Sequence, residues 1–118
     1  MTYAAPIAQM RFALEAAADL WSLRARFAEL DEDLLAAILE GAAQLAGDVL
    51  APINRKGDQA RVALANGEVK SAPGFREAYD AFREAGWLGL SADPAYGGQG
   101  LPRALMLAVF ETVHAANM

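Results

Sequence analysis

The sequence of 118 residues contains no cysteine and only one histidine, His114. Without cysteine the chain can have no disulfide framework, no thiolate nucleophile and no cysteine-ligated metal. With a single histidine it also lacks the nitrogen ligands of the common zinc sites. We therefore predict no metal-binding residue and no catalytic thiol.

Positive charge is also scarce, because 10 Lys and Arg face 15 Asp and Glu, which gives a net charge of −5. Nucleic acids and anionic membrane surfaces favour basic patches, so neither is an expected partner. The stretch Met1–Phe12 lacks the basic and apolar regions of a signal peptide. No apolar run approaches the ~18–20 residues of a membrane span. The expected location is the cytoplasm.

Apolar residues are abundant and make up 55% of the chain, above the ~45–50% that is usual in soluble domains. A chain of this length forms one domain, residues 1–118, with a modest core. The apolar excess has two explanations. It is either the composition of an alanine-rich helical domain or apolar surface that requires a partner.

Helical periodicity predicts two amphipathic segments in the first half of the chain. The first spans Ala4–Ala18, and Leu20–Phe27 either continues it or forms a separate turn. The second begins after Asp31, an N-cap residue, and Pro52 should kink or end it. Their apolar faces are Ile7, Met10, Leu14, Ala17 and Trp21 in the first segment, and Leu35, Ile38, Ala42, Leu45 and Val49 in the second.

Polar and turn-forming residues separate these helices from the rest. Residues 54–58 (NRKGD) are interpreted as a polar turn. Asn66-Gly67, between Arg61–Leu64 and Glu68–Lys70, is a strong hairpin signal. The sequence therefore predicts an all-α fold of several antiparallel helices with one short β-hairpin.

Two more helices are predicted after the hairpin. In the first, Phe75, Ala78, Tyr79 and Phe82 share one face, which is interpreted as part of the core and not as a cofactor site, and Gly86 ends the helix. Trp87 and Leu88 should then pack beneath its end.

The last helix, Pro102–Ala116, is apolar on almost every side, which is typical of a buried helix. A small domain cannot cover all of its sides. We therefore predict an exposed apolar patch formed by Leu105, Met106, Val109, Phe110 and Val113.

Few residues are candidates for chemistry. Asp31-Glu32-Asp33 is interpreted as a helix N-terminus, and Glu111 and His114 as a local helical pair. The glycine loop at Tyr96–Gly100 invites a phosphate-binding hypothesis, but no Lys follows it and the spacing of dinucleotide-binding glycines is absent. Turning the chain is the favoured interpretation of these glycines.

The segments Gly86–Leu90 (GWLGL) and Asp93–Pro102 (DPAYGGQGLP) resemble the N-terminal helical domain of acyl-CoA dehydrogenases, closest to the branch that includes 3-methylmercaptopropionyl-CoA dehydrogenases. The resemblance extends over nearly the whole chain, through Tyr3–Phe12, Val49–Asp58 and Pro73–Tyr79. It ends in Ala115–Met118 (AANM), before the middle and C-terminal domains of that family.

The resemblance implies a parent enzyme that uses FAD to oxidise an acyl-CoA thioester, with a glutamate as the base. In the family that glutamate and most flavin contacts come from later domains, so no residue of this chain is assigned a catalytic or cofactor-binding role. Two hypotheses follow. The chain is either the helical part of such an enzyme, without tight FAD binding or activity alone, or a free-standing helical interaction module.

Overall fold

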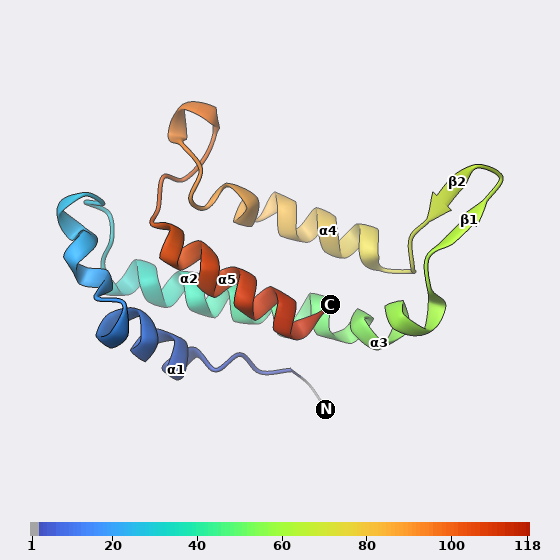
Figure 1. Ribbon diagram of the computed structural model, residues 1–118, viewed down its shortest axis with the longest axis horizontal. Helices are drawn as coiled ribbons and strands as arrows, with labels where there is room; N and C mark the ends of the chain where they lie inside the picture. Colours follow the sequence, from blue (N-terminus) through green and yellow to red (C-terminus); the bar gives the residue numbers. More distant parts are fainter. Residues whose placement is uncertain (1–2) are drawn as a thin grey trace.

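A computed structural model describes residues 3–118 of the chain and shows a mostly helical, flat molecule (Figure 1). Its principal extents are 54 × 37 × 18 Å, so it is about two helices thick. The helices and strands are α1 (Ile7–Phe12), α2 (Glu32–Leu45), α3 (Ala51–Ala60), β1 (Ala63–Ala65), β2 (Glu68–Lys70), α4 (Phe75–Glu84) and α5 (Arg103–Ala116).

The first helical segment is shorter than predicted. Helix α1 continues through one π-helical turn at Ala13–Ala17, and Asp19 then adopts a left-handed conformation with φ of 48°. This residue separates α1 from a 3-10 helix, Leu20–Ala25. The segment after Ala18 is therefore a turn of its own and not a continuation of the helix.

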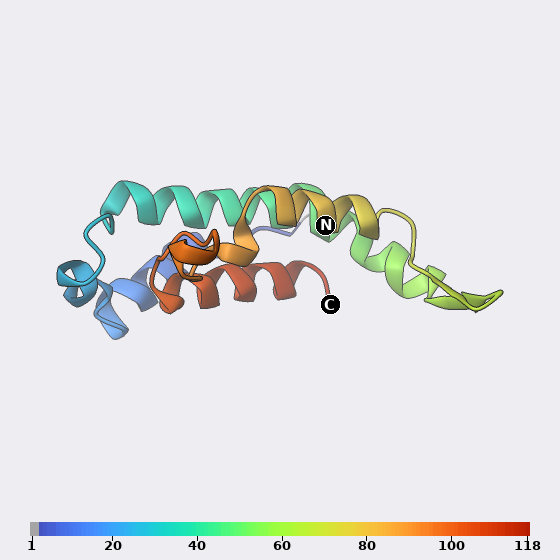
Figure 2. The ribbon, with the colours of Figure 1, turned by 90° about the horizontal axis from the view of Figure 1, so that it is seen from above.

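Helices α2 and α3 form one long helical run, joined by a π-helical turn at Ala46–Leu50. The run begins at Asp31, whose side chain accepts a hydrogen bond of 2.7 Å from the backbone N–H of Leu34, as the N-cap prediction requires. Pro52 lies just after the π-helical turn, in the interior of the run, where a proline kinks a helix. Figure 2 shows that the run bends between α2 and α3 but does not end there. The kink was therefore predicted correctly.

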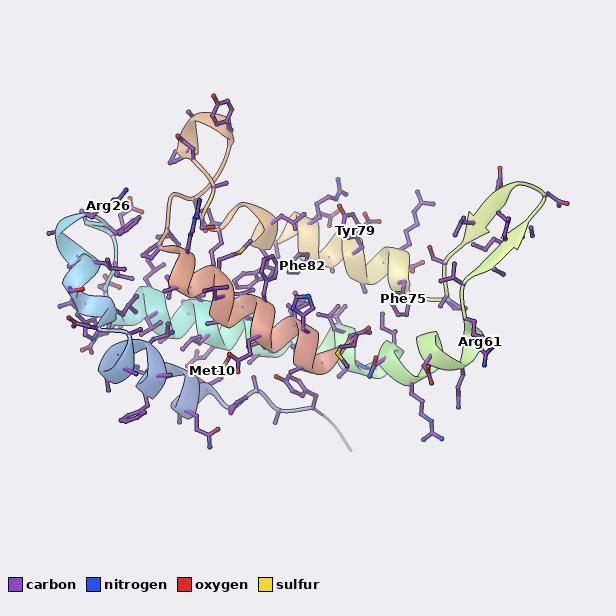
Figure 3. All side chains as sticks on the ribbon, in the orientation of Figure 1. Met10, Arg26, Arg61, Phe75, Tyr79 and Phe82 are labelled. Carbon is purple, nitrogen blue, oxygen red and sulfur yellow. The ribbon has the colours of Figure 1, made fainter. Side chains whose placement is uncertain are left out.

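The polar turn predicted at residues 54–58 is wrong, because all five residues lie within α3. Gly57 remains in the helix for a packing reason: the ring of Phe75, at the start of α4, lies directly over it and leaves no room for a Cβ. Figure 3 shows Phe75 at this end of α4. A tertiary contact thus explains a glycine that the sequence alone associates with a turn.

The described helices pack around α2. Helices α2 and α5 form the most extensive contact between two elements, and both run in the same direction, whereas α1 and α4 run the opposite way (Figures 1 and 2). The main core joins α1, α2 and α5 with residues of the loops. Its largest fully buried side chains are Leu20, Leu30, Leu35, Leu90, Leu105 and Val109.

A second, smaller cluster extends this core toward α4. It contains Ala46 and Leu50 from the π-helical turn, Ala78 from α4 and Ala116 from α5. Phe82 of α4 is also buried and lies between α4 and α5 in Figure 3, but Tyr79 is 56% exposed. The prediction that Tyr79 shares the buried face is therefore wrong, because the side of α4 that faces the domain carries Ala78 and Phe82 and leaves Tyr79 toward solvent.

The hairpin is confirmed. Strands β1 and β2 pair antiparallel, with Ala65 opposite Glu68 and Leu64 opposite Val69. Asn66 and Gly67 form the turn with φ of 54° and 78°, the combination that this turn type requires. Figure 1 shows the hairpin at one end of the molecule, beyond α3.

The run Glu32–Ala60 is long and apolar enough to cross a membrane by length and composition alone. The expectation that no segment meets this criterion is wrong, because the run qualifies as an average although polar residues interrupt it. The core helix of a soluble protein meets the same criterion. Here Leu35, Leu39 and Ala42 are buried against the rest of the domain.

Candidate functional site

The loop between α4 and α5 is held in shape by its own backbone and by Asp93. The side chain of Asp93 accepts a hydrogen bond of 2.8 Å from the N–H of Ala95, and its carbonyl accepts one of 3.1 Å from Gly98. Gly97 and Gly100 adopt φ of 85° and 65°, which favours glycine. The glycines therefore turn the chain, as the sequence analysis favoured.

The backbone amides of the loop are already engaged. Each N–H from Tyr96 to Leu101 donates to a carbonyl of the same segment, including Gln99 to Gly89 at 2.8 Å and Gly100 to Ala92 at 2.9 Å. A phosphate-binding loop needs amides that point at the ligand. These amides are not available, so the geometry does not favour the phosphate-binding hypothesis.

Two close contacts make the loop compact. A Cβ at Gly98 would collide with the carbonyl of Ala92, so the two backbone segments meet only because position 98 is glycine. The side-chain amide of Gln99 donates to the carbonyl of Gly86 at 3.1 Å. The loop is therefore fastened to the left-handed residue that ends α4.

Trp87 joins this loop to α2. A Cβ at Gly41 would lie 3.3 Å from two atoms of the Trp87 ring, so the indole rests on the backbone of α2. The ring is partly buried and packs against the main core. Leu88, predicted to pack beside it, is 47% exposed. That part of the prediction is wrong because the 3-10 turn of Trp87–Gly89 directs its neighbouring side chains apart.

An apolar groove with a volume of about 350 Å³ lies between the first helical segment and α5. Met10, Ala13 and Leu14 line one wall, and Ala104, Leu107 and Ala108 line the other, while Gln9 and Glu111 contribute polar atoms. Leu107 is 69% exposed at this groove. The groove is open to solvent and offers apolar contact with few polar groups.

The position of this groove corrects the predicted patch on α5. Leu105 and Val109 are completely buried against α2, and Met106, Phe110 and Val113 are partly buried. The prediction is therefore wrong for Leu105 and Val109, which the domain itself covers, whereas Met106, Phe110 and Val113 keep part of their surface exposed. Leu107 is the large apolar side chain of α5 that stays exposed.

A second recess, of about 830 Å³, lies between the glycine loop and the segment around Phe27. Arg26 and Arg103 bring positive charge to its lining, and Asp93 brings negative charge. Figure 3 shows Arg26 at the turn that follows the 3-10 helix. This recess is more polar than the groove.

The acidic residues and the histidine have helical roles. Glu32 approaches Arg11 at 3.9 Å, and Arg11 also pairs with Glu15 at 3.2 Å. His114 packs on Phe110, with ring centroids 5.8 Å apart, and forms no ion pair with Glu111, so the predicted helical pair is wrong. Within residues 3–118 no group of three His, Asp or Glu side chains is placed to hold a metal ion.

Two other polar side chains are also accounted for. The Thr112 hydroxyl is buried, donates to the carbonyl of Ala108 at 3.0 Å and lies 3.5 Å from the sulfur of Met10. Desolvation by burial raises the pKa of the Tyr3 phenol, and the Glu111 carboxylate adds to this increase. A phenol with a raised pKa is a poorer source of a phenolate at neutral pH. Neither group is arranged as a nucleophile.

Comparison with known proteins identifies a relative along the whole chain. The sequence is 35% identical over 120 aligned positions to 3-methylmercaptopropionyl-CoA dehydrogenase of Ruegeria pomeroyi. The alignment covers 100% of this chain and 20% of the relative, so the chain spans about a fifth of the length of the protein that it matches. No family model matches the sequence.

Proposed function

We propose that this chain belongs to the acyl-CoA dehydrogenase family and forms the N-terminal helical part of an FAD-dependent enzyme that oxidises an acyl-CoA thioester. The observation that supports this proposal most directly is the groove between the first helical segment and α5, with Leu107 exposed at its edge. An apolar surface of this kind favours contact with another folded surface. In the proposal, the remaining domains of the dehydrogenase provide this second surface.

The thinness of the molecule supports a dependent role. With a shortest extent of 18 Å, the helices form one slab whose two faces cannot both be buried within the chain. A ligand site normally encloses most of its ligand. A slab with an open groove provides one wall of such a site and needs other domains to close it.

The residues described here do not by themselves fit a bound flavin. The amides of the glycine loop are engaged, and the apolar groove is open and contributes few polar groups. Two of the acidic residues already have structural roles, since Asp31 caps α2 and Glu32 lies near Arg11. We therefore propose that the chain alone retains no FAD and has no dehydrogenase activity.

The proposal is tested with the purified 118-residue chain. Flavin absorbance after incubation with FAD and gel filtration, and acyl-CoA oxidation with an artificial electron acceptor, should both stay at background. A second polypeptide carrying the middle and C-terminal domains of the related dehydrogenase is then added. Flavin retention and turnover should appear only in the mixture. Stoichiometric flavin on the chain alone would overturn the inactive-part proposal.

A pair of variants tests whether the groove is the docking surface. Leu107→Glu places a charge at an exposed position of the groove and should prevent reconstitution without unfolding the chain. Tyr79→Glu is the matched control, because Tyr79 is also exposed but lies on α4, away from the groove. If both variants reconstitute equally well, the groove is not the docking surface.

The alternative is a free-standing helical interaction module without catalysis. It would use the same groove, but for a partner unrelated to the dehydrogenase. Failure of the mixture to restore flavin binding, with a folded chain that still exposes Leu107, would favour this alternative.

A further inference from the structure

The hairpin carries an exposed apolar face that no described helix covers. Val62, Leu64 and Val69 are 70%, 74% and 69% exposed. Leu64 and Val69 are directly opposite each other in the register, so they point to the same side of the two strands. Val62 precedes Leu64 by two residues, the period at which side chains of an extended chain return to the same side. Two strands alone form a marginal sheet with two open edges.

The outer edge of β2 presents backbone N–H and C=O groups that could pair with another strand. In a hairpin with a two-residue loop the flanking residues, here Ala65 and Glu68, form a hydrogen-bonded pair. The next pair, Leu64 and Val69, then directs its N–H and C=O groups away from each other. Val69 thus presents one donor and one acceptor at the outer edge of β2.

The side chains of β2 are complementary to a second copy of the same strand. Its sequence is Glu68-Val69-Lys70, so an antiparallel copy centred on Val69 places Glu68 opposite Lys70 of the other chain, twice. Opposite charges in directly facing positions stabilise a strand pair. Strand β1, Ala63-Leu64-Ala65, contains no charge that could select this arrangement.

We propose that β2 is a self-association surface, at which two copies of the chain pair through Val69 about a two-fold axis to form a four-stranded sheet. Val69 exchanges two backbone hydrogen bonds with Val69 of the second copy. Leu64 and Val69 of both copies form one apolar stripe, and the Glu68–Lys70 pairs lie on the opposite face. Because the hairpin stands at one end of the molecule (Figure 1), the two helical bodies lie on opposite sides of the axis.

The proposed contact is short, well below the ~1,200 Å² that a stable complex usually buries. Covalent trapping is therefore the suitable test, and the absence of cysteine from the sequence makes it simple. In Val69→Cys the two thiols face each other across the axis at a separation that a disulfide can bridge. In the control, Leu64→Cys, the thiol is equally exposed, but its copy lies three strand spacings away, roughly 14 Å.

Under mild oxidation of the folded chain, Val69→Cys should form at least about fivefold more disulfide dimer than Leu64→Cys, because only its thiols satisfy disulfide geometry. In denaturant the two variants should cross-link equally, which corrects for thiol reactivity. Equal yields in the folded state, or a higher yield for Leu64→Cys, would overturn the proposal. Far-UV circular dichroism of each variant checks that it is folded.

Charge exchange tests the register. In the Val69→Cys background, Glu68→Lys should lower the dimer yield, because Lys70 of the other copy then faces a like charge. Adding Lys70→Glu should restore the yield, since the opposite charges face each other again. Within one chain these residues face Ala65 and Ala63, so the exchange leaves the hairpin itself unaffected. If Glu68→Lys leaves the dimer yield unchanged, or if adding Lys70→Glu does not restore it, the proposed pairing is contradicted.

Discussion

The indole ring of Trp87 rests on Gly41 in the middle of α2, where a Cβ would approach two ring atoms to 3.3 Å. The contact joins the start of the loop before α5 to the helix around which the domain packs. Through this contact the glycine loop, α4 and α2 are fixed relative to one another.

Truncation of this ring should destabilise the whole domain. We expect Trp87→Ala to lower the free energy of unfolding by about 3 kcal/mol, the lower end of the range for a large aromatic residue because the ring is only partly buried. Tyr96→Ala is the control, since Tyr96 is 90% exposed. Chemical denaturation measures both. A loss for Trp87→Ala no larger than that of the control would show that the ring is not an anchor.

Two glycine variants in the loop should show separately how much close packing and backbone strain each cost in stability. Gly98→Ala introduces a collision with the carbonyl of Ala92 and should cost about 1–3 kcal/mol. At Gly97 there is space for a Cβ but φ is 85°, so Gly97→Ala should cost only about 1 kcal/mol from backbone strain. Thermal unfolding of the two variants compares these costs, and the reverse order would contradict this description of the loop.

The end of α5 should depend on Asn117. Its side-chain amide donates to the carbonyl of Leu50 in the π-helical turn at 2.9 Å, between residues that are 67 positions apart. Asn117→Ala should lower stability by about 1 kcal/mol. Asn54→Ala removes only a 3.4 Å contact with the N–H of Met118 and should cost less. Hydrogen exchange of the last turn of α5 should accelerate in the first variant.

The start of α2 should depend on Asp31 and not on its acidic neighbours. Asp31→Ala removes the hydrogen bond to the N–H of Leu34 and should cost about 1 kcal/mol. Asp33→Ala removes only a charge in the first turn and should cost at most about 0.5 kcal/mol. Equal losses in a denaturation series would assign the effect to charge and not to the cap.

The local features of this fold could be read from neighbouring residues. Asp31 as a cap, Asn66-Gly67 as a turn and Gly86 as a helix end depend on backbone preferences that act over a few positions. The structure confirms all three. Family resemblance was also readable, because the loop sequence around Gly97–Leu101 is specific, and the whole chain aligns with a dehydrogenase.

Side-chain exposure on α5 could not be read in this way. Its sequence is apolar on almost every side, so periodicity cannot distinguish Leu105, which is fully buried, from Leu107, which lines the groove. Which of the two is buried depends on which side of α5 faces the rest of the domain. The candidate groove was therefore not predicted.

The sequence by itself determined the helical class, the hairpin, the helix caps and the resemblance to a dehydrogenase, because each depends on short-range backbone preferences or on a run of specific residues. Only the tertiary structure decided that Gly57 belongs to a helix, that Trp87 rests on Gly41 and that Leu107 remains exposed. The physical reason is that these outcomes depend on which distant surface approaches each residue. Such contacts, over tens of positions in the chain, have no counterpart in local periodicity.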